Sequence, residues 1–136
     1  MKFSKKVMVF GTFDILHKGH LNFFKQAKKH GDYLIAVVAR DKTVKKIKKK
    51  KPKHYEMFRL LNVALTKDVN IAVLGSLNDP YKVIEDNKPK VICLGYDQDS
   101  YTAKLEDELK KRRLKIKIVR LKPYKEHIYK SSKMRK

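Results

Sequence analysis

The chain has 136 residues, with 35 Lys and Arg against 14 Asp and Glu, so its formal net charge at pH 7 is +21. This length fits one domain, and the 42% of hydrophobic residues is enough to form a core. The only cysteine, Cys93, excludes an intrachain disulfide and a zinc site built from cysteines. No stretch is typical of a membrane span or a signal peptide, so we expect a cytoplasmic protein. The positive charge favours anionic partners such as nucleotides, phosphorylated metabolites or nucleic acid.

The first apolar segment predicts a strand that leads into a phosphate-binding turn. Residues 7–10 are four β-prone apolar residues in a row, which is typical of a strand covered on both faces. Gly11 permits a tight turn, and the helix that follows presents unpaired N–H groups and its positive dipole end, which favour a phosphate. His17 and His20 are three residues apart, so they lie on one helix face and can contact the same ligand.

Alternating strands and helices follow along the chain. The first helix is expected to end before Gly31, and residues 33–39 form a second apolar strand. This order predicts a right-handed crossover and a parallel sheet. Further strands are predicted over residues 70–74, 91–94 and 116–121, and further helices over 54–66, 80–86 and 102–113. The apolar face of the helix over 54–66 is assigned to Met57, Leu60, Leu61, Ala64 and Leu65.

Two basic segments remain between and after these elements. Residues 42–53 carry eight lysines and end near Pro52, and we expect a mobile loop with at most one helical turn at its start. Such runs are usually solvated, but this one leaves the carboxyl edge of the sheet, where α/β folds bind ligands. In the tail, residues 122–136, two serines precede Lys and Arg, which indicates either an anion-binding helix start or a frayed basic end.

The string Gly11-Thr12-Phe13-Asp14-Ile15-Leu16-His17-Lys18-Gly19-His20 resembles the signature of the H-x-G-H nucleotidyltransferases, and within them the cytidylyltransferase-like group. The resemblance continues in family order over nearly the whole chain, through Gly95-Tyr96-Asp97-Gln98 and Ser131-Ser132-Lys133-Met134. It implies a single nucleotidyltransferase domain over residues 1–136, with an α/β fold: a Rossmann-like three-layer sandwich around a five-stranded, mainly parallel sheet. The chain departs from the pattern by stopping two residues after Met134.

The resemblance also implies the chemistry and the residues that carry it. The family transfers a nucleotidyl group from a nucleoside triphosphate to a phosphate monoester, with Mg²⁺ held mostly by phosphates and by few protein ligands, none of which is assigned to a residue here. His17 and His20 are implied as hydrogen-bond donors to the reacting phosphate, at least one of them cationic in the transition state, while Asp14 orders the turn. The implied catalytic residues are His17, His20, Lys51 and Arg59. The implied nucleotide-binding residues are Gly11, Thr12, Phe13, His17, His20, Gly95, Asp97, Gln98, Tyr129, Ser131 and Ser132. The candidates for the acceptor phosphate are Asp41, Lys46, Lys49, Lys51 and Arg59.

Several functions remain open at this point. Short strings such as Ala39-Arg40-Asp41, Leu74-Gly75-Ser76 and Gly95-Tyr96-Asp97-Gln98 are similar to the archaeal-type FAD-synthase branch, which implies transfer of AMP from ATP to FMN. Glycerol-3-phosphate cytidylyltransferase, which uses CTP, is the alternative with the same chemistry. A basic nucleic-acid-binding module is the alternative of another class, although we expect only non-specific binding because the lysines gather in one segment. The family resemblance further implies a homodimer.

Overall fold

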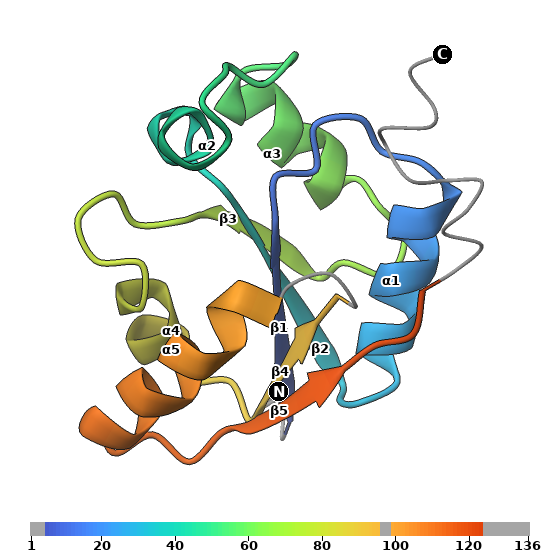
Figure 1. Cartoon of the computed structure of the whole chain (residues 1–136). Helices are drawn as coiled ribbons and strands as arrows, with labels where there is room; N and C mark the ends of the chain where they lie inside the picture. Colours follow the sequence, from blue (N-terminus) through green and yellow to red (C-terminus); the bar gives the residue numbers. More distant parts are fainter. Residues whose placement is uncertain (1–4, 96–98, 124–136) are drawn as a thin grey trace.

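The structure, a computed structural model, describes residues 5–95 and 99–123, and the side chains of residues 99–103 are not described. Its five strands form one parallel sheet with the order β3-β2-β1-β4-β5 (Figure 1). The strands are β1 (Lys6–Gly11), β2 (Tyr33–Val38), β3 (Ile71–Leu74), β4 (Val91–Leu94) and β5 (Lys117–Arg120). This arrangement confirms the predicted Rossmann-like α/β class.

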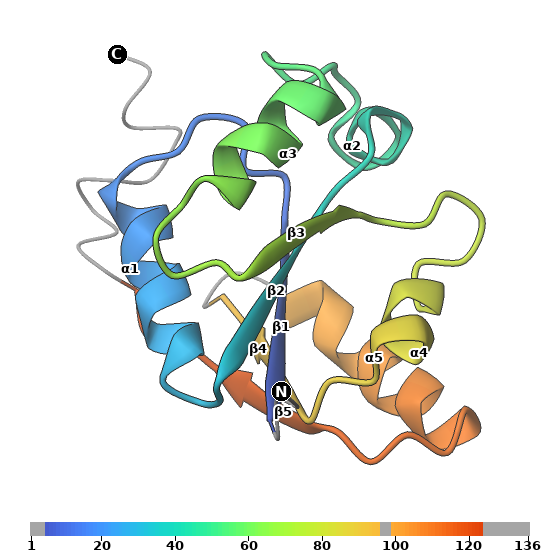
Figure 2. The same cartoon turned by 180° about the vertical axis from the view of Figure 1, so that it is seen from behind.

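Five helices complete the described part of the chain. They are α1 (Lys18–Lys28), α2 (Asp41–Lys48), α3 (Glu56–Ala64), α4 (Lys82–Asn87) and α5 (Asp99–Lys111). Helices α1 and α3 cover one face of the sheet, and α4 and α5 cover the other (Figure 2). Within the residues described, no helix is both long enough and apolar enough to cross a membrane.

The continuous apolar strands follow from burial on both faces. In β1, Val7 and Val9 pack in the cluster with Phe24 of α1, whereas Met8 packs in the opposite cluster with Ile84 of α4. Successive strand side chains point to opposite faces, so a strand covered twice needs no polar positions. Each such buried side chain contributes about 1.5–3 kcal/mol. The sheet is therefore covered by helices on both faces. Because its strands are parallel, their carboxyl ends all lie at one edge of the sheet.

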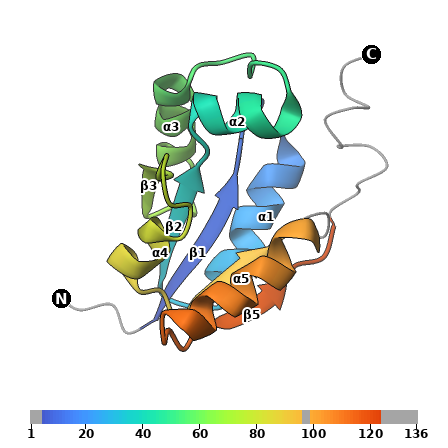
Figure 3. The same cartoon turned by 60° about the vertical axis from the view of Figure 1, so that its left-hand side comes forward.

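Helix α2 corrects the predicted loop over residues 42–53. It is eight residues long and lies beyond the end toward which β1 and β2 point (Figure 3). Val44 is its buried residue, Asp41 lies in its first turn and Lys48 in its last, and these charges complement the helix dipole. The helix ends at Lys49, whose φ is 60°. The lysine-rich sequence of this segment did not indicate a helix. The short helix that it forms places several lysines near the carboxyl edge of the sheet.

Helix α3 corrects the predicted apolar face in part: Leu60 packs against the core as predicted, whereas Ala64 and the larger apolar residues of that face are exposed. Met57, Leu61 and Leu65 are 54%, 56% and 76% exposed, whereas Arg59 and Val63 are fully buried. The helix is rotated so that the arginine faces the carboxyl edge of the sheet. The inward face of α3 therefore carries Arg59 with its polar contacts beside the apolar Val63.

Candidate active site at the carboxyl edge of the sheet

The turn after β1 is built around an aromatic side chain. A Cβ at Gly11 would lie 2.6 Å from the ring of Phe13, so the glycine makes room for this ring and not, as its position after the strand suggested, for a ligand. Phe13 has a φ of 52° and its ring packs on Phe24, with ring centroids 5.1 Å apart. The rings of Phe13 and His20 form a T-shaped pair with their centroids 5.7 Å apart. The Phe13 ring therefore packs between Phe24 and His20 and helps to hold His20 in place.

The two histidines cap helix α1 reciprocally. His17 is the N-cap residue, and its Nδ1 accepts a hydrogen bond from the backbone N–H of Gly19 at 3.0 Å. The Nδ1 of His20 accepts from the backbone N–H of His17 at 3.3 Å. Helix starts normally use Ser or Thr with Glu or Gln for such a capping box. Here imidazoles take those places, which fixes both rings, and their centroids are 4.0 Å apart.

This capping determines where each imidazole carries its proton. A neutral imidazole has one donor and one acceptor nitrogen, and Nδ1 accepts in both rings. The proton of each neutral ring therefore lies on Nε2. An Nε2–H group is the donor that a phosphate oxygen requires, so the helix cap prepares both histidines as hydrogen-bond donors.

Burial keeps both imidazoles neutral near pH 7. Burial lowers the pKa of His20 to about 4, and the charges of His17 and Lys48 add to the effect. Burial also lowers the pKa of His17. The cationic imidazole expected in the transition state is therefore not the form of the ligand-free protein. Negative charge from a bound triphosphate is what would favour the cation.

Among the lysines of α2, the structure draws attention to one that sequence reasoning missed. Burial and the charge of His17 lower the pKa of His20 most, and the charge of Lys48, in the last turn of α2, adds to this effect. Lys48 and the predicted candidates Lys46, Lys49 and Lys51 are all exposed to solvent. Eight lysines in twelve residues give no signal in the sequence that singles one out, and Lys48 differs only by the effect of its charge on His20.

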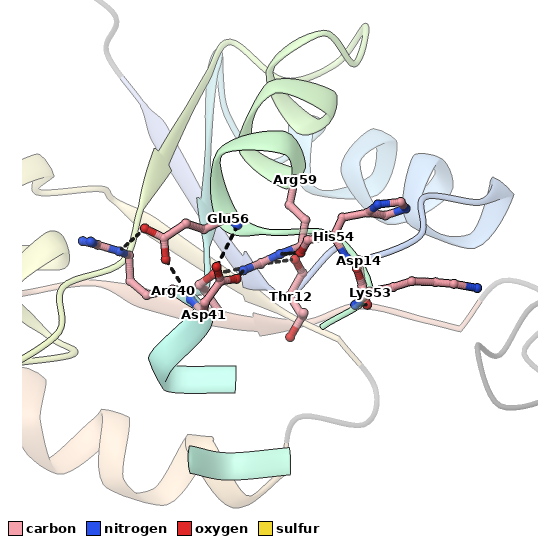
Figure 4. Close-up of polar contacts among 9 residues, drawn as sticks. Thr12, Asp14, Arg40, Asp41, Lys53, His54, Glu56 and Arg59 are labelled. Carbon is pink, nitrogen blue, oxygen red and sulfur yellow. Dashed lines mark hydrogen bonds and ion pairs between the residues drawn. The ribbon is translucent and has the colours of Figure 1, made fainter. Parts of the chain in front are cut away.

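Asp14 fastens the next loop to the turn. Its carboxylate accepts hydrogen bonds from the backbone N–H groups of Lys53 and His54, at 2.6 and 2.8 Å (Figure 4). Both carboxylate oxygens are thereby engaged. The residue orders the site in the way that the sequence suggested, with the added finding that it also holds the segment between α2 and α3.

Arg59 and Asp41, both predicted as contacts of the acceptor phosphate, contact each other in this structure. The Arg59 side chain is fully buried, and its Nη2 donates to Asp41 Oδ1 at 2.6 Å. Its Nη1 donates to the carbonyl oxygens of Thr12 and Ala39, and its Nε donates to that of His54 (Figure 4). These groups are bound to one another, so they do not present their charges to a ligand in this structure.

Other predicted site residues divide between the described and undescribed parts of the chain. Gly95 follows β4, and its carbonyl oxygen accepts from Arg120 Nη1 at 2.7 Å. Asp97, Gln98, Tyr129, Ser131 and Ser132 lie outside the described residues. Within the described ranges, no three His, Cys, Asp or Glu side chains are grouped so as to hold a metal ion.

Comparison with known proteins supports the assignment suggested by the site. The family model described as cytidylyltransferase-like matches residues 8–136. A curated relative from Aciduliprofundum boonei, named FAD synthase, is 49% identical over 119 residues, which cover 88% of this chain and 79% of the relative. A second FAD synthase, from Thermoplasma volcanium, is 41% identical over 131 residues, 96% of this chain and 92% of the relative.

Solved structures show the same relationship. A protein from Thermoplasma volcanium, described as a lipopolysaccharide core biosynthesis protein, has a TM-score of 0.85 and 41% sequence identity, and the match covers 90% of this chain and 99% of that one. Pantoate-beta-alanine ligase from Francisella tularensis has a TM-score of 0.66 at 17% identity, covering 86% of this chain and 58% of that one, and this likeness concerns the fold alone. With the family model matching almost its entire length, the chain belongs to the cytidylyltransferase-like family.

Proposed function

We propose that the chain is an FMN adenylyltransferase, an enzyme that transfers AMP from ATP to the phosphate of FMN and releases pyrophosphate. The observation that carries the proposal is the pair of imidazoles at the start of α1, each with its proton on Nε2. The choice of ATP and FMN is supported by curated relatives named FAD synthase, which are 41–49% identical over most of both chains.

The reaction is an in-line displacement at the α-phosphorus of ATP. An oxygen of the FMN phosphate attacks, the bond from the α-phosphorus to the bridging oxygen breaks, and pyrophosphate leaves with that oxygen. The attacking phosphate is already anionic near neutral pH, so catalysis consists of positioning and charge stabilisation. His17 and His20 donate Nε2–H groups to the α-phosphate and to the leaving oxygen. Lysines of α2 and the following loop, including Lys48 and Lys51, offset the phosphate charge.

The rest of the nucleotide site stays part of the proposal. The turn at Gly11, Thr12 and Phe13 supplies backbone groups near the phosphates, and the residues after β4 and in the tail face the base, ribose and triphosphate; these are Gly95, Asp97, Gln98, Tyr129, Ser131 and Ser132. Mg²⁺ enters on the phosphates of ATP, as it commonly does.

Pyrophosphate release tests the substrates directly. ATP and CTP are each combined with FMN and with glycerol-3-phosphate, and turnover with ATP and FMN alone is expected. Turnover restricted to CTP and glycerol-3-phosphate would contradict the proposal and assign the chain to the alternative with the same chemistry. Tight RNA or DNA binding that survives physiological salt, without nucleotide turnover, would instead support the binding-module alternative.

A homodimer in the cytoplasm completes the proposal. Helix α3 supports it: Met57, Leu61 and Leu65 are exposed, and residues 54–66 contain no lysine in a chain with 35 Lys and Arg. Exposed apolar groups of this kind commonly mark protein interfaces. Sedimentation equilibrium is expected to give a dimer that Leu61→Glu converts to a monomer, and a monomeric wild-type chain would overturn this part. The buried, free Cys93 thiol fits a reducing compartment.

A further inference from the structure

Arg59 joins three chain segments at the edge where the reaction is proposed to occur: the signature turn, the junction of β2 with α2, and the start of α3. Its guanidinium donates to the carbonyl oxygen of Thr12 in the signature turn at 2.9 Å and to that of Ala39 after β2 at 2.8 Å. It also donates to the carbonyl oxygen of His54 before α3, and it pairs with Asp41 at the start of α2 (Figure 4). A fully buried arginine is held in place by such contacts, and in turn it holds the segments that provide them.

The starts of α2 and α3 cap each other beside this arginine. The backbone N–H of Asp41 donates to Glu56 Oε1 at 2.8 Å, and the backbone N–H of Glu56 donates to Asp41 Oδ2 at 3.2 Å. Neither helix receives a side-chain cap from its own N-cap residue, Arg40 or Tyr55. Each helix start therefore depends on a carboxylate from the other helix.

Charge within this cluster is balanced. Arg59 pairs with Asp41, and Arg40 pairs with Glu56 through Nε and Oε2 at 3.0 Å. Two cations and two anions leave no net charge for a substrate phosphate. Positive charge lies instead in the last turn of α2, at Lys45, Lys46 and Lys48. The charge of Lys48 contributes to the lowered pKa of His20. Helix α2 thus connects the balanced cluster at its start with these lysines at its end.

We propose that Arg59, Asp41 and Glu56 are positioning residues that fix the start and direction of α2, so that the lysines of its last turn lie over the carboxyl edge of the sheet for the phosphates of the substrate. The proposal rests on the proposed adenylyl transfer for its catalytic consequence. A helix moves as a rigid element, so a change at its first residue displaces its last turn. Displacements of about 1 Å at a reacting centre commonly cost on the order of 10²-fold in rate.

The experiment uses the full chain with Asp41→Asn and Arg59→Lys, and Asp79→Asn as the matched control. Asp79 pairs with Arg112 at 3.0 Å, but this pair lies between α4 and α5, on the other face of the sheet. Hydrogen exchange over residues 41–48, measured without substrate, reports the order of α2. NMR titration of the His20 ring reports whether Lys48 remains nearby, and kcat and KM for ATP report the consequence.

Asp41→Asn and Arg59→Lys are expected to speed exchange in residues 41–48 and to raise the pKa of His20 slightly. Burial and the charge of His17 lower this pKa most, and the smaller contribution of the Lys48 charge is lost when α2 moves. Both substitutions are also expected to reduce kcat by about 10- to 100-fold. Asp79→Asn is expected to change none of these. Should Arg59→Lys not fold, Asp41→Asn still carries the test.

Two results would overturn the positioning role. Lost turnover with unchanged exchange and an unchanged His20 titration would show that Asp41 or Arg59 acts on the substrate directly. Faster exchange with wild-type kcat would show that the cluster serves stability alone. A wild-type chain without adenylyl transfer would contradict the proposed function, whereas exchange and the His20 titration would still decide whether the cluster positions α2.

Discussion

Two arginine clusters, one on each side of the molecule, show how the same residue type serves different ends. Arg59 is fully buried and bonds to three backbone carbonyl oxygens and one carboxylate at the carboxyl edge of the sheet. Arg112 is 19% exposed and pairs with the carboxylates of Asp79, Glu85 and Glu108. Backbone contacts position chain segments, whereas carboxylate pairs near the surface join neighbouring helices. The clusters should therefore respond differently to mutation.

The largest expected effect is on stability, from removing the buried arginine. Arg59→Ala leaves three carbonyl oxygens and Asp41 without their partner, and the free energy of unfolding should fall by about 3 kcal/mol or more. Urea unfolding followed by circular dichroism measures the change. A loss below about 1 kcal/mol would show that the Arg59 cluster contributes no more than a surface ion pair does.

The next largest effect is on the reaction rate, and it concerns the two histidines at the carboxyl edge of the sheet. His20→Ala or His17→Ala removes one donor to the reacting phosphate, and kcat should fall by about 10²–10³, equal to about 2.7–4 kcal/mol in the barrier. Steady-state pyrophosphate release with ATP and FMN measures it, and circular dichroism confirms the fold. The structure indicates which nitrogen donates. Both Nδ1 atoms accept hydrogen bonds in the helix cap, so Nε2 is the donor in each ring.

The two sides also differ in the pH at which they lose stability. The pKa of His20 is about 4 in the folded chain and near 6.5 in the unfolded one, so the unfolded chain binds the proton first. The contribution of His20 to the free energy of unfolding therefore has its full value above about pH 6.5. As the pH drops from 7 to 5, this contribution falls by roughly 2 kcal/mol. The hydrogen bond from the Tyr81 N–H, helped by Arg112, lowers the pKa of Asp79 below 3.8, so the other side loses stability only at lower pH.

Unfolding measured from pH 7 to 3 separates these windows. His20→Gln should flatten the change between pH 6.5 and 4, while Asp79→Asn should alter only the region below about pH 4. If His20→Gln leaves the upper window as steep as in the wild type, the histidine is not buried in the neutral form described here.

The smallest expected effects concern single surface charges. Lys48→Gln should lower kcat/KM for ATP by about fivefold to tenfold, or about 1 kcal/mol, because it removes one partly screened charge from the phosphates. Arg112→Ala should cost about 1 kcal/mol of stability and leave kcat unchanged, since its pairs are near the surface. A larger loss of activity in Arg112→Ala than in Lys48→Gln would contradict the account in which the Arg112 cluster serves stability alone and the carboxyl edge serves catalysis.

The same contrast explains what the sequence was able to predict. The strands followed from uninterrupted apolar runs such as residues 33–39, and the histidine pair followed from its spacing after Gly11. Helix α2 was missed because eight lysines concealed the one buried residue, Val44. The inward face of α3 was missed because Arg59 is buried by contacts with residues 5 to 47 positions away in the chain. Local patterns carry no information about such partners.

FAD formation from ATP and FMN is the most direct test of the central claim, and we would compare the wild-type chain with His20→Ala at pH 7. Wild-type turnover that releases one pyrophosphate per FAD, with a loss of about 10²–10³ in the variant, is the predicted result. Equal turnover by both proteins, or turnover with CTP and glycerol-3-phosphate in place of ATP and FMN, would contradict the proposed enzyme.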